Sequence, residues 1–221
     1  HIYLEGENIL ETSNRDSAAL QKENTSELII NNVPNSAGSL IAAAINTDTS
    51  TETGVQKILA WGAGIGGGAN QKGSNITING GSITASSTVG AGIGGGGYTG
   101  GNGEKISING GTITAKAGTG AGIGGGELCH GSNITIKNGF VTADSAIGAG
   151  IGGGANGYGK DITIENGSIT ADSSFGAGIG GGYLKNGNNI IISNSLVSAS
   201  SDRGDSIGGG DESETSSNIT I

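Results

Sequence analysis

The chain has 221 residues, including 48 glycines and one cysteine, and a formal net charge of -9. One cysteine excludes a disulfide within the chain, and a hydrophobic content of 33% is small for an ordinary globular core. The ten lysines and arginines are scattered along the sequence, which argues against nucleic-acid binding because that depends on clustered positive charge.

The first 61 residues are irregular but contain three short apolar runs, "SAALQ" from Ser17, "ELIIN" from Glu27 and "GSLIA" from Gly38. We interpret residues 1–61 as about two diverged coils of the repeat that follows. The polar run "INTDTSTETG" from Ile45 predicts a protruding loop.

One heptapeptide recurs through the rest of the chain. "GAGIGGG" begins at Gly62, Gly90, Gly120, Gly148 and Gly176, and a variant, "GDSIGGG", begins at Gly204. A fixed period of this length is typical of stacked repeat proteins. Between the copies stand paired β-branched runs such as "NITINGGSITA" from Asn75, which predict two strands joined by a Gly/Asn corner.

These observations predict an all-β fold, a single-stranded parallel β-helix with three sides and about 28 residues per coil. We expect right-handed winding, following the preference of parallel crossovers. Residues 62–221 would form regular coils that continue residues 1–61 as one solenoid.

Alternation within the strands predicts which side chains fill the interior. In the first strand Ile76 and Ile78 should point inward and Thr77 outward, because successive strand side chains point to opposite faces. Stacking of the coils would then place equivalent isoleucines in columns. The Gly/Asn corner between the strands is expected to adopt the left-handed backbone conformation.

The same alternation places Ala91 and Ile93 inside the solenoid and the neighbouring glycines outside. The first glycine of the block is unchanged in every copy, at Gly62, Gly90, Gly120, Gly148 and Gly176. We expect a positive φ at this position; the alternative is close approach of a second backbone or a ligand. In the second case the block would form a flat strip suited to a polymer or to self-association with a second copy of the chain.

Variable loops follow the glycine blocks and should leave the solenoid at one corner, where they form a rim. Tyr98, Tyr158 and Tyr183 lie on these loops. Exposed tyrosine rings can stack on sugar rings while their hydroxyls form hydrogen bonds, so we expect a polysaccharide or a surface glycan as partner. The alternative is that the rings only cover neighbouring loop backbone.

A second variable column stands directly before the glycine blocks. Its members are Trp61, Val89, Thr119, Ile147, Phe175 and Arg203. The column either fills a wide corner of the core or forms an apolar contact patch.

Candidates for catalysis and metal binding are few. Cys129 and His130 are adjacent, and neighbours in a strand point apart, so they predict neither a nucleophile–base pair nor an enzyme. Asp144 and Asp172 should stack after the second strand, but two carboxylates supply too few oxygen ligands for calcium without help from the backbone. We therefore expect no cofactor, with calcium as the alternative.

The residues from Ser17 to the end resemble the glycine-rich β-helical repeats of large surface proteins of anaerobic, often gut-associated, bacteria. The resemblance rests on "GAGIGGG" alternating with "NGGSITA", and it implies the fold and a surface location. The lead-in, "LEGENIL" and "SAALQKENTSELII", is similar to bacterial carbohydrate-binding β-helix domains that recognise plant polysaccharides such as pectin. That similarity implies carbohydrate binding but identifies no binding residue.

A composition rich in Ser, Thr, Gly and Asn with one cysteine favours a secreted or cell-surface bacterial protein. The sequence has no signal peptide, lipidation motif or apolar run for direct membrane insertion, and it starts and stops in strand-like segments. We expect a piece of a longer protein, with signal and anchor elsewhere.

The hypothesis is a non-catalytic extracellular module that binds carbohydrate or mediates adhesion, and the alternative is a structural stalk or fibre. Ice binding is a minor alternative, suggested by an outward threonine column, Thr84, Thr114, Thr142 and Thr170, although Phe140 and Leu196 interrupt the neighbouring row.

Overall fold

The computed structural model describes residues 1–45 and 59–221. The loop expected after Ile45 lies in residues 46–58, outside the described part of the chain. No helix able to cross a membrane is found in the described residues.

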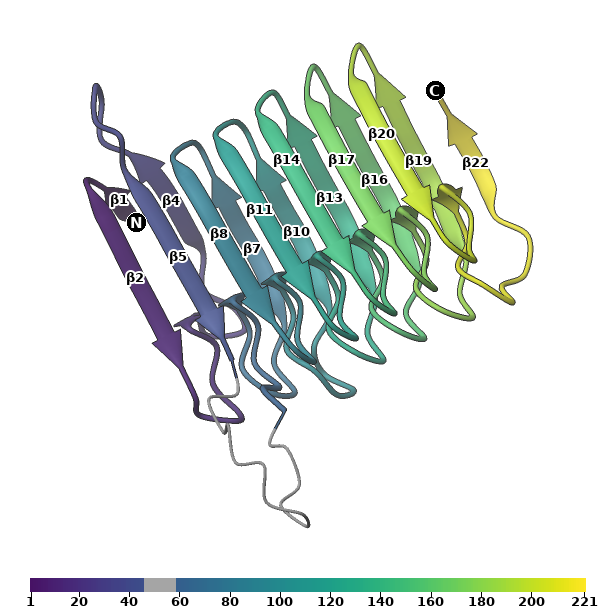
Figure 1. The fold of residues 1–221 in the computed structure, drawn as a ribbon, viewed down its shortest axis with the longest axis horizontal. Helices are drawn as coiled ribbons and strands as arrows, with labels where there is room; N and C mark the ends of the chain where they lie inside the picture. The colour runs from purple at the N-terminus through teal and green to yellow at the C-terminus, as the bar shows by residue number, and fades with distance from the viewer. Residues whose placement is uncertain (46–58) are drawn as a thin grey trace.

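The chain winds into a parallel β-helix of about seven turns, with about 28 residues per coil and three sheets (Figure 1). Sheet A contains β1 (Ile2–Leu4), β4 (Leu28–Asn32), β7 (Gly73–Ile78), β10 (Gly103–Ile108), β13 (Gly131–Lys137), β16 (Gly159–Glu165), β19 (Gly187–Ser193) and β22 (Ser217–Thr220). Sheet B contains β2 (Glu7–Thr12), β5 (Ser39–Ala44), β8 (Ser82–Ser87), β11 (Thr112–Ala117), β14 (Phe140–Ser145), β17 (Ser168–Ser173) and β20 (Leu196–Ser201). Sheet C contains the two-residue strands β3 (Leu20–Gln21), β6 (Ile65–Gly66), β9 (Ile93–Gly94), β12 (Ile123–Gly124), β15 (Ile151–Gly152), β18 (Ile179–Gly180) and β21 (Ile207–Gly208).

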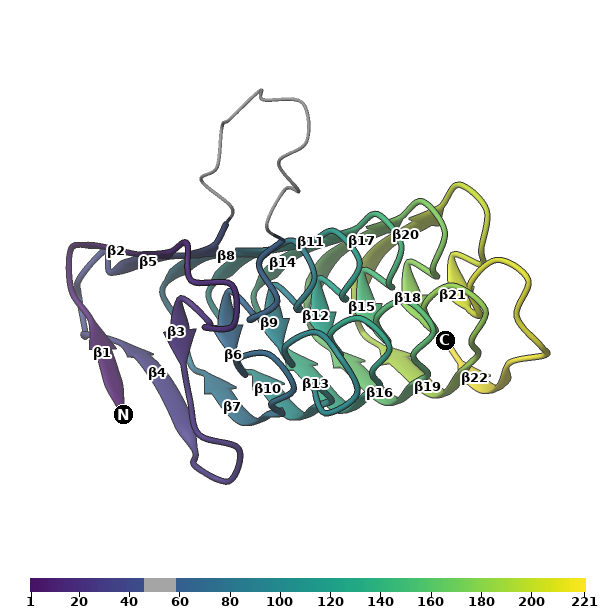
Figure 2. The same cartoon turned by 90° about the horizontal axis from the view of Figure 1, so that it is seen from below.

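The winding is right-handed, as predicted. In Figure 1 the strands of sheet A run upward behind those of sheet B, which run downward in front, while successive coils advance to the right. Figure 2 shows sheet C along the remaining side, between the other two sheets.

Stacked isoleucines fill the interior, and this confirms the predicted columns. Along sheet A the aligned residues, each 0% exposed, are Ile76, Ile106, Ile134, Ile162 and Ile190. Burying each side chain stabilises the fold by about 1.5 to 3 kcal/mol. Each coil contacts only its neighbours, so the free energy of folding depends on coil-to-coil stacking.

The diverged N-terminal strands continue the same three sheets. Leu20 pairs with Ile65 in sheet C, and Leu28 pairs with Ile76 in sheet A. In sheet B, Leu40 pairs with Ile83. The apolar runs of residues 1–61 therefore occupy the same sides of the solenoid as the regular repeats.

The corner between sheets A and B has left-handed backbone, as expected. Asn138, Asn166 and Asn194 have φ values of 60°, 55° and 48°, and in two earlier coils Gly81 and Gly111 have 94° and 98°. The left-handed residue is the second of the corner at Gly81 and Gly111, whereas the first corner residue is also left-handed where it is Asn138. Asn and Gly tolerate this conformation better than other residues.

The glycine block is buried, so the predicted outward orientation of its glycines is wrong. Every residue from Gly90 to Gly96 is buried, and the positive φ occurs at Gly94 (139°) rather than at the first glycine. A Cβ atom on Gly90 would lie 2.5 Å from the carbonyl oxygen of Gly62 in the preceding coil. Close approach of a second backbone, the alternative explanation, therefore accounts for the first glycine.

Equivalent glycines have the same environment along the solenoid. A Cβ atom would lie within 2.2 to 2.5 Å of backbone of the preceding coil at Gly62, Gly120, Gly148 and Gly176. The second glycine packs against sheet B, because a Cβ on Gly92 would lie 2.8 Å from the backbone nitrogen of Lys116. A flat glycine strip open to solvent is thus absent from the described blocks between residues 62 and 182.

Serine hydroxyls join the ends of the sheet B strands to the glycine blocks. Ser87 donates to the carbonyl oxygen of Gly62 at 2.6 Å, and Ser145 donates to that of Gly120 at 2.6 Å. Ser173 donates to the carbonyl oxygen of Gly148 at 2.7 Å. All three serines are buried. Each bond satisfies a carbonyl that would otherwise be expensive to bury.

Substitution of glycines tests this packing. Gly122→Ala should lower the free energy of unfolding by about 1 to 3 kcal/mol, because its Cβ would lie 2.6 Å from the carbonyl oxygen of Gly150. Gly110→Ala is the matched control, since its Cβ would lie 3.6 Å from the nearest atom, the carbonyl oxygen of Asn79, with no positive φ. Chemical denaturation of both variants measures the difference; equal stabilities would contradict the packing.

Candidate functional site

The variable loops stack along one corner of the solenoid, at the lower edge in Figure 1. We call them the rim: residues 69–72, 97–102, 127–130, 155–158, 183–186 and 211–216. Backbone hydrogen bonds fold the rim back over the coil, for example from the N–H of Gly97 to the carbonyl oxygen of Trp61 at 2.6 Å. The N–H of Ala155 donates in the same way to Thr119 at 2.8 Å. This folding covers the glycine block and fixes the position of the rim.

A row of side chains underlies the rim. It comprises Trp61, Val89, Thr119, Ile147 and Phe175, which we call the corner row. Val89 is 2% exposed and the other four are half-buried. Arg203, the sixth member of the predicted column, is exposed. The row fills the corner, and its two aromatic members, Trp61 and Phe175, also pack against aromatic rings of the rim.

Tyr98 is stacked on the corner row. Its ring lies 3.4 Å from the ring of Trp61, centroid to centroid, with an angle of 9° between the planes. The guanidinium carbon of Arg15 lies 4.9 Å from the Trp61 centroid. Tyr98 is 37% exposed and has a φ of 70°. One face of the Tyr98 ring is therefore taken by tryptophan.

Tyr158 lies on the rim between two neighbouring loops. Its ring centroid is 5.3 Å from that of His130, and the Nζ atom of Lys185 lies 5.2 Å from the Tyr158 centroid. Tyr158 is 40% exposed. The N–H of Tyr158 donates to Nδ1 of His130 at 3.1 Å. The backbone of this tyrosine is thus held by an imidazole.

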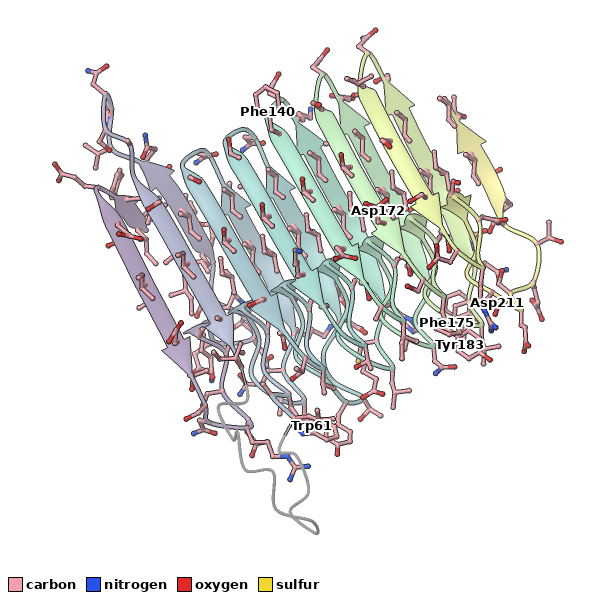
Figure 3. All side chains as sticks on the ribbon, in the orientation of Figure 1. Trp61, Phe140, Asp172, Phe175, Tyr183 and Asp211 are labelled. Carbon is pink, nitrogen blue, oxygen red and sulfur yellow. The ribbon has the colours of Figure 1, made fainter. Side chains whose placement is uncertain are left out.

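Tyr183 packs edge-on against the corner row. Its ring centroid is 6.0 Å from that of Phe175 at an angle of 81°, and the two rings lie together near Asp211 in Figure 3. The guanidinium carbon of Arg203 lies 4.9 Å from the Phe175 centroid. Tyr183 is half-buried.

The structure places the three tyrosines on one rim but in three separate clusters. Figure 3 shows Trp61, under Tyr98, at one end of the lower edge and Tyr183 towards the other. Tyr183 occupies the same loop position as Ala155 of the preceding coil, whereas Tyr158 occupies the same loop position as His130 of the preceding coil. The rings are therefore not stacked on one another, and each cluster includes a cation beside an aromatic ring.

Positive charge without a carboxylate partner gathers around Tyr158. No ion pair in the described residues involves Lys160 or Lys185. Partial burial, and then the charges of these two lysines, lower the pKa of His130, against a raising influence of Glu104. Sequence reasoning missed this cluster because its members come from three successive loops.

The thiol of Cys129 is enclosed by the rim. It is 1% exposed, and its Sγ donates to the carbonyl oxygen of Tyr98 at 2.6 Å. Burial raises the pKa of the thiol to about 11. The adjacent His130 uses Nδ1 to accept from Tyr158, so the two groups do not form a thiolate–imidazolium pair in this arrangement.

Asp144 and Asp172 are neighbours on the outer face of sheet B. Asp144 lies 4.0 Å from Nζ of Lys116, and Ser200 donates to Oδ1 of Asp172 at 2.5 Å. No cluster of three or more His, Cys, Asp or Glu residues suited to a metal is found in the described residues.

The outward threonine column is present on sheet B, where Thr84, Thr114, Thr142 and Thr170 pair in register. The neighbouring row contains Phe140, which is 66% exposed, and Leu196, which is 76% exposed. This face therefore carries one continuous hydroxyl row beside a second row, Ser82, Thr112 and Ser168, that Phe140 and Leu196 interrupt.

Four segments match the family model described as a beta helix repeat, residues 76–97, 106–127, 134–155 and 162–183. The chain is a parallel β-helix protein. Each matched segment runs from the first buried isoleucine of a sheet A strand to the first residue of the rim. Comparisons with curated proteins and with solved structures gave no match. A β-helix repeat of this kind is consistent with a structural or adhesion-like module.

The packing of the rings predicts different stability effects for two tyrosines. Tyr98→Ala should lower the free energy of unfolding by about 1 to 2 kcal/mol, because it removes the stacked contact with Trp61. Tyr158→Ala should cost less than about 1 kcal/mol, because its ring is tilted away from direct stacking. Thermal and chemical denaturation would measure both, and a larger loss for Tyr158→Ala would contradict this assignment.

Proposed function

We propose that the protein is a non-catalytic module that binds an extended carbohydrate polymer along its rim, at the surface of a bacterial cell or in secreted form. The observation that carries the proposal is the presence of three aromatic clusters on one edge, each with a cation beside a ring. Aromatic rings stack on sugar rings, and arginine or lysine can pair with an acidic substituent. The rim therefore suits polymers that contain acidic sugars better than neutral ones.

The repeat geometry favours a long ligand over a small one. Equivalent loops recur in every coil, so a polymer lying along the rim contacts several clusters at once. Multivalency then provides affinity that one shallow site lacks. The protein as a whole is acidic, with a net charge of -9, and Arg203 is already paired with Asp211 at 3.5 Å. Arg15 and Lys185, which have no ion pair in the described residues, are therefore the local sites for a negatively charged group.

A structural stalk is the second candidate function. The uninterrupted isoleucine columns and the in-register sheets favour it, because they make an elongated body that could separate two other parts of a protein. A stalk needs no ligand. Binding measurements therefore separate the two candidates.

Affinity gel electrophoresis tests the binding function with matched variants. Polymers of neutral sugars and of uronic acids are included in separate gels, and we expect the acidic polymers to retard the protein. Tyr158→Ala should weaken retardation by about fivefold, the equivalent of about 1 kcal/mol for one ring. Phe140→Ala is the control, because Phe140 is exposed at the edge opposite the rim (Figure 3).

Two outcomes contradict the proposal. One is an unretarded parent protein in every polymer, which would favour the stalk. The other is a loss of binding in Phe140→Ala with Tyr158→Ala unchanged, which would place the ligand on the outer face of sheet B rather than on the rim.

A further inference from the structure

One column of the rim connects successive coils through side-chain acceptors. Asn24 Oδ1 accepts the N–H of Lys72 at 2.7 Å, and Asn102 Oδ1 accepts the N–H of His130 at 3.0 Å. In the following coil Nδ1 of His130 accepts the N–H of Tyr158 at 3.1 Å. An imidazole thus does at this level what an asparagine amide does at two earlier levels.

The substitution of imidazole for amide introduces a titratable acceptor. An amide oxygen keeps its lone pairs across the physiological pH range, whereas an imidazole nitrogen accepts only while it carries no proton. The contact with Tyr158 therefore requires the neutral form of His130, with its proton on Nε2.

The surroundings of His130 favour the neutral form. The side chain is half-buried, and Lys160 and Lys185 place positive charge near the ring, which together lower its pKa. Glu104, on β10, acts in the opposite direction but is paired with Lys72 at 3.2 Å. The remaining facing group is the tilted ring of Tyr158.

We propose that His130 makes the Tyr158 segment of the rim sensitive to acid: when its imidazole gains a proton, the N–H of Tyr158 loses its acceptor and becomes open to solvent, while the Tyr158 carbonyl still accepts from the N–H of Gly131. The binding consequence rests on the proposed function, because Tyr158 is one of its aromatic surfaces. The structural switch itself requires no ligand.

The sign follows from the protonation equilibrium. A histidine whose pKa is lowered by folding supports the ordered state fully above its ordinary pKa of about 6.5, and this support is lost as the pH falls through the lowered value. The Tyr158 N–H is thus held by His130 at neutral pH and freed in acid.

Amide hydrogen exchange measures the switch directly. Between about pH 7.5 and about pH 4.5, the protection factor of the Tyr158 amide, corrected for intrinsic exchange, should fall by about fivefold or more. The Lys72 amide, which Asn24 holds in the same way, is the internal control and should stay within about twofold.

His130→Asn is the matched variant, because Asn102 already performs this role one coil earlier. We expect its Tyr158 amide to be protected at both pH values. A constant protection factor in the parent overturns the switch, and so does an equal fall in His130→Asn. These exchange measurements contain no polymer. The acid switch can therefore be absent in a protein that binds polymers along the rim, and it can be present in a protein that binds none.

Discussion

The solenoid depends on backbone packing directly against backbone at the glycine block. Neighbouring strands in a sheet are about 4.8 Å apart, and the first glycine of each block turns its Cα–H towards a carbonyl of the preceding coil. A Cβ on Gly120 would lie 2.4 Å from the oxygen of Gly90, a separation that real side chains do not reach. Any other residue would separate the coils at this side while sheets A and B held them together. This constraint explains why one position resists change when the neighbouring loops vary freely.

The position of the rim follows from the same constraint. Because the second glycine lies against sheet B, the block occupies a narrow space, and the following loop folds back to the corner row through the hydrogen bond from the N–H of Gly97 to the carbonyl oxygen of Trp61 and its equivalents. The core and the glycine block are then uniform from coil to coil, and variation is confined to the rim. The beta helix repeat segments end where the rim begins, which agrees with this division. Stability belongs to the uniform part, and recognition, in our proposal, to the variable part.

Sequence periodicity could predict the sheets because a strict alternation of Ile and Thr allows one interior face. It could not predict the glycine block, because sheet C strands have two residues and a φ of 139° at Gly94, where alternation no longer defines a face. The rim tyrosines were located but not grouped, since Tyr98 and Tyr183 pack on residues of other coils. The His130 contact was missed because its column contains Lys72 and Tyr158, which conceal the recurring asparagines.

Amide exchange of the glycine block tests the central claim most directly. The N–H groups of Gly92, Ile93 and Gly95 donate to the next coil at 3.1, 3.0 and 3.0 Å. We predict that they are protected as strongly as the amides of the paired sheet A strands, because opening them requires separation of the coils. Exchange as fast as that of exposed loop amides would contradict the account, since the block would then be a solvent-facing strip.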